Sequence, residues 1–105
     1  MFDFLKKLFS KTDYKDLLER GAQIVDVRSK GEFAGGHIPM SINIPLDQLQ
    51  SGLSKLDKNK PIIACCASGM RSASAVPIIK AKGFAEVVNG GGWNGLYNKL
   101  ENAMN

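Results

Sequence analysis

The chain has 105 residues, which is the size of one domain and is long enough to bury a core without disulfide bonds. Its two cysteines are adjacent and it has one histidine, so a disulfide framework and an ordinary zinc site are both excluded. The formal net charge of +4 comes with lysines spread over the whole sequence, which favours anionic partners mildly and is not the pattern of a nucleic-acid-binding protein.

The first eleven residues form a distinct segment with apolar side chains at helical spacing. They predict an amphipathic helix with the apolar face Phe2, Phe4, Leu5, Leu8 and Phe9. Three interpretations are open: a helix packed on the domain, an exposed helix that contacts a membrane surface or a partner protein, or a frayed tail. The segment is too short and too polar for a secretory signal, so we expect a cytoplasmic protein. No apolar run reaches the about 18 residues of a membrane span.

A folded domain is expected over residues 12–105. Thr12 or Asp13 can cap a helix that continues to Arg20, and Gly21 ends it. Residues 23–27 then read as a strand.

Asp26 and Arg28 lie at the end of this first predicted strand. The carboxyl ends of parallel strands are where α/β proteins place their sites, so the pair is a candidate for a supporting role there. The other interpretation, which we favour, is a structural ion pair that holds neighbouring loops together.

The next stretch alternates short elements with turns. Residues 29–34 predict one helical turn, 41–44 a short strand and 46–56 an interrupted amphipathic helix. His37, the single histidine, could be a general base, but nothing nearby forms a Ser/His/Asp arrangement. We therefore interpret His37 as a residue that holds a turn by bonding the backbone.

The stretch around Cys66 is the strongest functional signal. Residues 61–65 are apolar and predict a buried strand, and a helix opens at about Arg71. A short loop between a strand and a helix aims backbone N–H groups at its centre, and the helix dipole and Arg71 add positive potential. We therefore expect Cys66 to have a pKa well below the free value of about 8.5. The loop consists of Ala67, Ser68, Gly69, Met70 and Arg71.

The chain closes with a strand at 86–88, a flexible glycine link at 89–92 and a helix at 93–100. Strands that alternate with helices predict an α/β fold with a central parallel sheet of about four or five strands and helices on both faces. The cysteine loop would then lie at the carboxyl edge of the sheet, where such folds bind ligands.

Taken together, these motifs resemble the rhodanese family over roughly residues 12 to 101. The motifs that carry the resemblance are Asp26-Val27-Arg28, Glu32-Phe33, Gly36-His37-Ile38-Pro39, Asn43-Ile44-Pro45, Cys66-x-Ser68-Gly69-x-Arg71-Ser72 and Gly90-Gly91-Gly92-Trp93. Met40 stands where the family usually has glycine. The resemblance implies a rhodanese-like three-layer α/β/α domain.

The resemblance also implies a sulfurtransferase. In that interpretation Cys66 accepts a sulfane sulfur from thiosulfate or a protein persulfide donor and passes it to cyanide or a thiol. The N–H groups of residues 67–71 would stabilise the anionic sulfur, and Arg71 would close the loop. No metal and no organic cofactor is implied.

Three alternatives remain. Counted from Cys65, the run to Arg71 has the Cys-x5-Arg spacing of cysteine phosphatases and arsenate reductases, although Gly69 falls one position late for that loop. The domain could be a non-catalytic rhodanese-like binding module. Cys65 could also resolve an oxidised Cys66, but alternation along a strand predicts that Cys65 faces the core.

Overall fold

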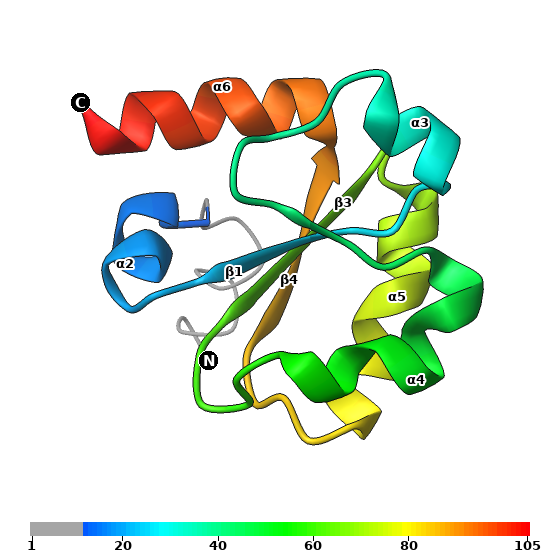
Figure 1. The fold of residues 1–105 in the computed structure, drawn as a ribbon. Helices are drawn as coiled ribbons and strands as arrows, with labels where there is room; N and C mark the ends of the chain where they lie inside the picture. The colour runs from blue at the N-terminus through cyan, green and yellow to red at the C-terminus, as the bar shows by residue number, and fades with distance from the viewer. Residues whose placement is uncertain (1–11) are drawn as a thin grey trace, which may run out of the picture.

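A four-stranded parallel sheet runs through the middle of the protein (Figure 1). The computed structural model describes residues 12–105, so the predictions made for residues 1–11 lie outside the described part of the chain. The strands lie in the order β2-β1-β3-β4, which agrees with the predicted parallel sheet of about four or five strands. Their bounds are β1 Gln23–Asp26, β2 Ile42–Asn43, β3 Ile62–Cys66 and β4 Val87–Gly92.

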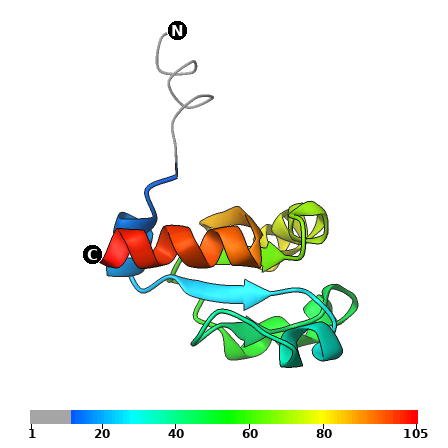
Figure 2. The same cartoon turned by 90° about the horizontal axis from the view of Figure 1, so that it is seen from above.

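Helices cover both faces of the sheet, so the domain has three layers (Figure 1). One face carries α2 (Tyr14–Glu19) and α6 (Trp93–Met104), and the other carries α4 (Leu49–Gly52) and α5 (Met70–Ala81). The short α3 (Lys30–Ala34) lies beyond the carboxyl ends of the strands. Seen from above, the axis of α6 lies nearly parallel to the line of β1 (Figure 2). None of the described helices is long and apolar enough to cross a membrane.

Sequence signals locate the ends of the first helices. The side chain of Asp13 accepts a hydrogen bond from the Asp16 N–H at 3.1 Å, which is the predicted cap of α2. Ser29 and Glu32 form a reciprocal capping box at the start of α3. The interrupted stretch at 46–56 divides into α4 and two 3-10 turns, Leu46–Gln48 and Leu53–Lys55.

The core consists of two apolar clusters, one on each face of the sheet. Because side chains alternate along a strand, Ala64 and Cys66 of β3 join the cluster against α4 and α5, while Cys65 joins the cluster against α2 and α6. All three residues are fully buried. The prediction that Cys65 faces the core is therefore confirmed, and the two sulfur atoms lie on opposite sides of the sheet.

The last strand is longer than predicted. Residues 89–92 continue β4 instead of forming a flexible link, and α6 begins at the next residue. The pairing with β3 skips Gly90, which makes a bulge at that point. A side-chain carbon at Gly90 would lie 2.7 Å from Leu96 Cδ2 and 3.1 Å from the Ala64 carbonyl oxygen. Gly90 therefore allows close packing, and the prediction of a flexible link at 89–92 is wrong.

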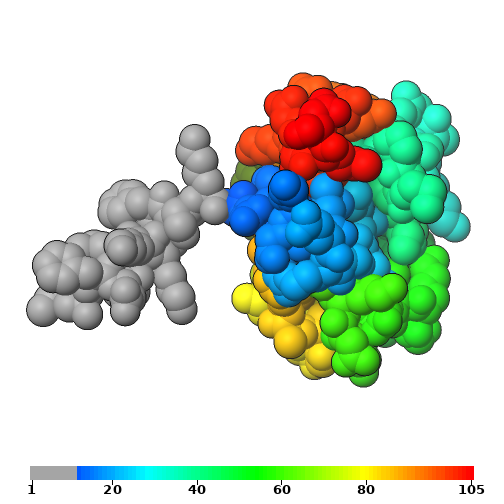
Figure 3. Space-filling view, turned by 90° about the vertical axis from the view of Figure 1, so that its left-hand side faces the viewer, coloured from blue at the N-terminus to red at the C-terminus, as the bar shows by residue number. Residues whose placement is uncertain are grey.

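The face formed by α2 and α6 has an apolar hollow of about 540 Å³. Figure 3 looks onto α2 and the carboxyl end of α6, two of the elements that border it. Its apolar lining includes Leu18, Ile38, Met40, Tyr97, Leu100 and Met104. Met40, which stands where the family usually has glycine, has a left-handed φ of 70° and a fully exposed side chain. The hollow lies across the sheet from Cys66 and takes no part in the site described next.

Candidate active site

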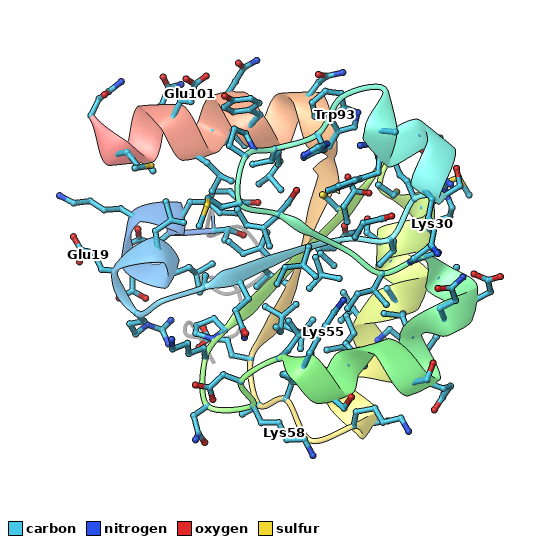
Figure 4. All side chains as sticks on the ribbon, in the orientation of Figure 1. Glu19, Lys30, Lys55, Lys58, Trp93 and Glu101 are labelled. Atoms are coloured by element: carbon cyan, nitrogen blue, oxygen red, sulfur yellow. The ribbon has the colours of Figure 1, made fainter. Side chains whose placement is uncertain are left out.

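Cys66 is the last residue of β3, and α5 begins four residues later at Met70. The predicted order of strand, small-residue loop and helix is therefore confirmed. The loop lies at the carboxyl edge of the sheet, beside α3 and near the first turn of α6 (Figure 1). Figure 4 marks Trp93 at the start of α6 and Lys30 at the start of α3, on this side of the domain.

Gly69 gives the loop its reversal of direction. Its φ of +97° is left-handed, and a side-chain carbon there would lie 3.2 Å from Gly91 Cα. This conformation points the Gly69 N–H at the sulfur of Cys66, with an N–Sγ distance of 3.0 Å. A larger residue at position 69 would therefore disturb both the reversal and the packing against β4.

The sulfur of Cys66 is surrounded by hydrogen-bonding groups. Ser72 lies 3.4 Å from Sγ with both its backbone nitrogen and its hydroxyl oxygen. Burial raises the pKa of the thiol, but the Ser72 hydroxyl and the amides of Ser72, Ser68 and Gly69 outweigh it and lower the pKa to about 7. A substantial fraction of the Cys66 thiol is therefore ionised at neutral pH.

The sequence anticipated part of this environment. Of the amides at 67–71 that the resemblance assigned to the anion, those of Ser68 and Gly69 act on the sulfur. Ser72, one position further on, contributes both an amide and a hydroxyl, a role that was not predicted for it. The contribution of the Ser72 N–H could have been predicted, because N–H groups in the first turn of a helix have no partner within the helix.

Arg71 does not make the contacts expected of it. Both of its terminal nitrogens bind the carboxylate of Glu32, at 2.7 and 2.9 Å, instead of bonding groups of the loop. Glu32 is held in place because it also belongs to the capping box of α3. Hydrogen bonds from Arg71 and Ser29 lower the pKa of Glu32 to about 2, so the pair persists at neutral pH. Arg71 thus joins α5 to α3.

Asp26 and Arg28 form the structural ion pair that we favoured. The guanidinium of Arg28 lies 2.8 Å from the Asp26 carboxylate, and the side chains are 5% and 0% exposed. Arg28 also donates to the Gly36 carbonyl at 2.7 Å and lies over the ring of Trp93. The pair therefore connects β1 to the loop after α3 and to α6, and it supports the edge of the sheet on which the cysteine loop lies.

The single histidine has the structural role that we expected. His37 Nδ1 donates to the Phe33 carbonyl at 2.7 Å, and the two rings stack. This hydrogen bond ties the turn after α3 to the helix itself.

Cys65 is unsuited to act as a nucleophile. Desolvation by burial and the charge of Asp26 raise the pKa of its thiol to about 12. Its side chain packs in the cluster against α2 and α6, away from the loop. The same placement keeps it from forming a disulfide with Cys66 unless β3 is reorganised.

We expect Arg71→Ala to raise the Cys66 pKa by less than Ser72→Ala does. The guanidinium is 39% exposed and shares its charge with Glu32, whereas Ser72 bonds the sulfur directly. Titration of the ultraviolet absorbance of the thiolate measures both shifts. Arg20→Ala, which removes another exposed and paired arginine, is the control. A larger pKa shift for Arg71→Ala than for Ser72→Ala would mean that the charge of Arg71 stabilises the thiolate more than Ser72 does.

Comparisons with known proteins agree with this geometry. The sequence profile of the Rhodanese-like domain matches residues 10–99. The uncharacterized protein YqhL of Bacillus subtilis (strain 168) is 39% identical over 70 residues, which cover 67% of this chain and 56% of that protein. The chain therefore spans just over half the length of this relative.

A second relative and a solved structure match more of their own length. Thiosulfate sulfurtransferase GlpE of Pseudomonas savastanoi pv. phaseolicola is 36% identical over 77 residues, which cover 71% of this chain and 73% of that protein. The crystal structure of a rhodanese-like domain protein from Staphylococcus aureus has a TM-score of 0.66 and 32% identity, and the match covers 91% of this chain and 85% of that one. The resemblance noted in the sequence is confirmed, and the chain belongs to the rhodanese-like domain family.

Proposed function

We propose that this protein is a sulfurtransferase that carries a sulfane sulfur as a persulfide on Cys66. The observation that carries this proposal is a thiol with a pKa of about 7, held at the end of a strand and bonded by amides of the loop. Such a thiol is a nucleophile at neutral pH without a dedicated general base. Membership of a family that includes a relative named thiosulfate sulfurtransferase supports the same reaction class.

The proposed reaction has two displacement steps. With thiosulfate as donor, the Cys66 thiolate attacks the outer sulfur, a new S–S bond forms, and sulfite leaves with the electron pair of the bond that breaks. The negative charge of the persulfide then lies on its outer sulfur, which the loop amides are suited to stabilise. An acceptor such as cyanide attacks that sulfur, and the Cys66 thiolate leaves and is regenerated. With a protein persulfide as donor, the leaving group is the donor's thiolate.

We propose that the donor approaches the cysteine loop beside Arg71. A hollow of about 490 Å³ is lined there by Val27, Ser29, Pro45, Leu46, Asp47 and Arg71. We propose that it admits a small sulfur-containing anion, or the persulfide side chain of a protein donor, to the cysteine loop. The hollow carries one charge of each sign, from Asp47 and Arg71, so the preference for an anion comes from the amides around the sulfur and not from the hollow.

The alternatives are less well supported. A phosphatase or arsenate reductase that uses Cys65-x5-Arg71 would need an ionised Cys65, but that thiol has a pKa of about 12 and lies in the core. A non-catalytic binding module would have no use for a cysteine with a lowered pKa. Both features favour Cys66 chemistry over its rivals.

Incubation with thiosulfate is expected to add the mass of one sulfur atom to the protein. The added mass should be lost on treatment with cyanide or a reductant, since both attack the outer sulfur of a persulfide. Intact-mass spectrometry measures the gain, and peptide mapping should place it on Cys66. If thiosulfate leaves the mass unchanged and a small persulfide donor adds the sulfur, the natural donor is of the persulfide class. A protein that stays unmodified with both donors would contradict the proposed function.

A further inference from the structure

The hydroxyl of Ser72 has one hydrogen and two possible acceptors. Its oxygen lies 2.6 Å from Asn89 Oδ1 and 3.4 Å from Cys66 Sγ. A hydroxyl can donate only one hydrogen bond at a time. The position of this hydrogen therefore depends on which of the two neighbours attracts it more strongly.

The amide of Asn89 is oriented by its other partners. Its oxygen accepts the Gly91 N–H at 2.9 Å, and its Nδ2 donates to the Gly69 carbonyl at 3.1 Å. The reverse orientation would set Nδ2 against the Gly91 N–H and Oδ1 against the Gly69 carbonyl. The amide oxygen therefore faces Ser72, so the hydroxyl hydrogen points to Asn89 and its lone pairs face the sulfur.

This arrangement suits the neutral thiol and not the thiolate. A thiol hydrogen can point at the Ser72 oxygen, so every group has a partner. After ionisation the sulfur has no hydrogen, and the two sets of lone pairs face each other unless the hydroxyl rotates toward Sγ. Rotation gives up the short bond to Asn89, whose oxygen keeps the Gly91 N–H.

We propose that Asn89 is a positioning residue that competes with the Cys66 sulfur for the hydroxyl hydrogen of Ser72. This role of Asn89 rests on the proposed function, in which Cys66 is the sulfur carrier. In the empty carrier the charge is on Sγ and draws the hydrogen from Asn89. In the persulfide the charge has moved to the outer sulfur, so the hydrogen returns to Asn89. The Ser72 hydroxyl thus bonds Sγ when the carrier is empty and Asn89 when it holds a sulfur. The competition from Asn89 limits how strongly Ser72 stabilises the thiolate of the empty carrier.

The other charged groups around the sulfur are constant over the range in which Cys66 ionises. Arg71 of α5 faces the loop and is paired with Glu32 of α3. Cys65 of β3 stays a neutral thiol, since its pKa is about 12. The side chain that β4 contributes, Asn89, carries no charge. A change in ionisation on altering Asn89 or Ser72 can therefore be assigned to the shared hydrogen.

The experiment is a double-mutant cycle on the Cys66 pKa, read from the ultraviolet absorbance of the thiolate. Asn89→Ala should lower the pKa by about half a unit, the size expected for one neutral hydrogen bond. Ser72→Ala should raise it, and adding Asn89→Ala to Ser72→Ala should then change nothing. Asn89→Asp, which retains the acceptor oxygen and adds a negative charge, should raise it. Asn98→Ala, on the exposed face of α6, is the control and should leave it unchanged.

The result that overturns the proposal is a rise, or no change, on Asn89→Ala, or an equal change with and without the Ser72 hydroxyl. Either would make Asn89 a support of the loop only, because loosening the loop would shift the pKa in the same direction for Asn89→Ala and Asn89→Asp. The titration needs no sulfur donor. It therefore tests this inference separately from the loading experiment, whose failure would leave the shared hydrogen in place.

Discussion

Replacing Cys66 by serine should abolish sulfur transfer. A serine hydroxyl at the end of β3 stays protonated under conditions in which the Cys66 thiol, with its pKa of about 7, is half ionised. The same loop amides would surround the oxygen, but it is a weak nucleophile and forms no persulfide. A thiosulfate–cyanide assay that detects thiocyanate measures the effect, and the remaining rate should be that of the uncatalysed reaction.

The neighbouring cysteine supplies the matched control. Cys65→Ala should retain most of the activity, because this side chain packs on the opposite face of the sheet and forms no part of the loop. It should cost a modest amount of stability, since removing one buried sulfur leaves a small cavity. The opposite pattern, with Cys65→Ala inactive, Cys66→Ser active and phosphate esters hydrolysed, would move the protein to the phosphatase class.

The second large effect is on stability. Arg28→Ala should lower the free energy of unfolding by about 3–5 kcal/mol, because it leaves the fully buried carboxylate of Asp26 without an opposite charge, with the backbone N–H of residue 28 as the remaining hydrogen-bond donor to its side chain. It also removes the hydrogen bond to the Gly36 carbonyl and the contact with Trp93. Urea unfolding followed by the fluorescence of Trp93 measures the change, with circular dichroism as a second probe because Trp93 touches the mutated side chain.

An exposed ion pair gives the comparison. Arg20 bonds Glu86 at 2.6 Å with both side chains 45% exposed, so Arg20→Ala should cost much less stability than Arg28→Ala does. A loss of similar size for Arg28→Ala and Arg20→Ala would mean that water or a structural adjustment satisfies Asp26 in the variant. Asp26 and Arg28 would then be marginal to the stability of this edge of the sheet.

The sequence predicts local structure here much better than contacts between distant segments. Asp13 could be predicted as a helix cap, and Gly21 as the end of that helix, because each acts on its immediate neighbours. Alternation along β3 likewise separates Cys65 from Cys66 without any knowledge of the fold. The sequence therefore predicts that the side chains of the two cysteines lie on opposite faces of the sheet.

The contacts that tune the site could not be predicted in the same way. Arg71 meets Glu32 across 39 positions of the chain, and Ser72 meets Asn89 across 17. The second pairing follows from the strand order and from the bulge that places Asn89 opposite Ala64 and Gly91 opposite Cys65. Reading the glycines of β4 as a flexible link hid that bulge, and with it the partner of Ser72.

The pKa of Cys66 is lowered to about 7, yet Cys66 has no exposed surface. The reactivity of the sulfur therefore depends separately on its ionisation and on access to it. A reagent can reach the sulfur only when residues of the loop move aside. Large electrophiles and stray thiols are admitted more slowly than the ionisation state alone would allow, which protects the reactive atom from damage and its cargo from leakage. If Cys66 carries sulfur as proposed, the time for which it holds a sulfur atom depends on how often the loop opens, and a partner whose surface opens the loop would receive that sulfur.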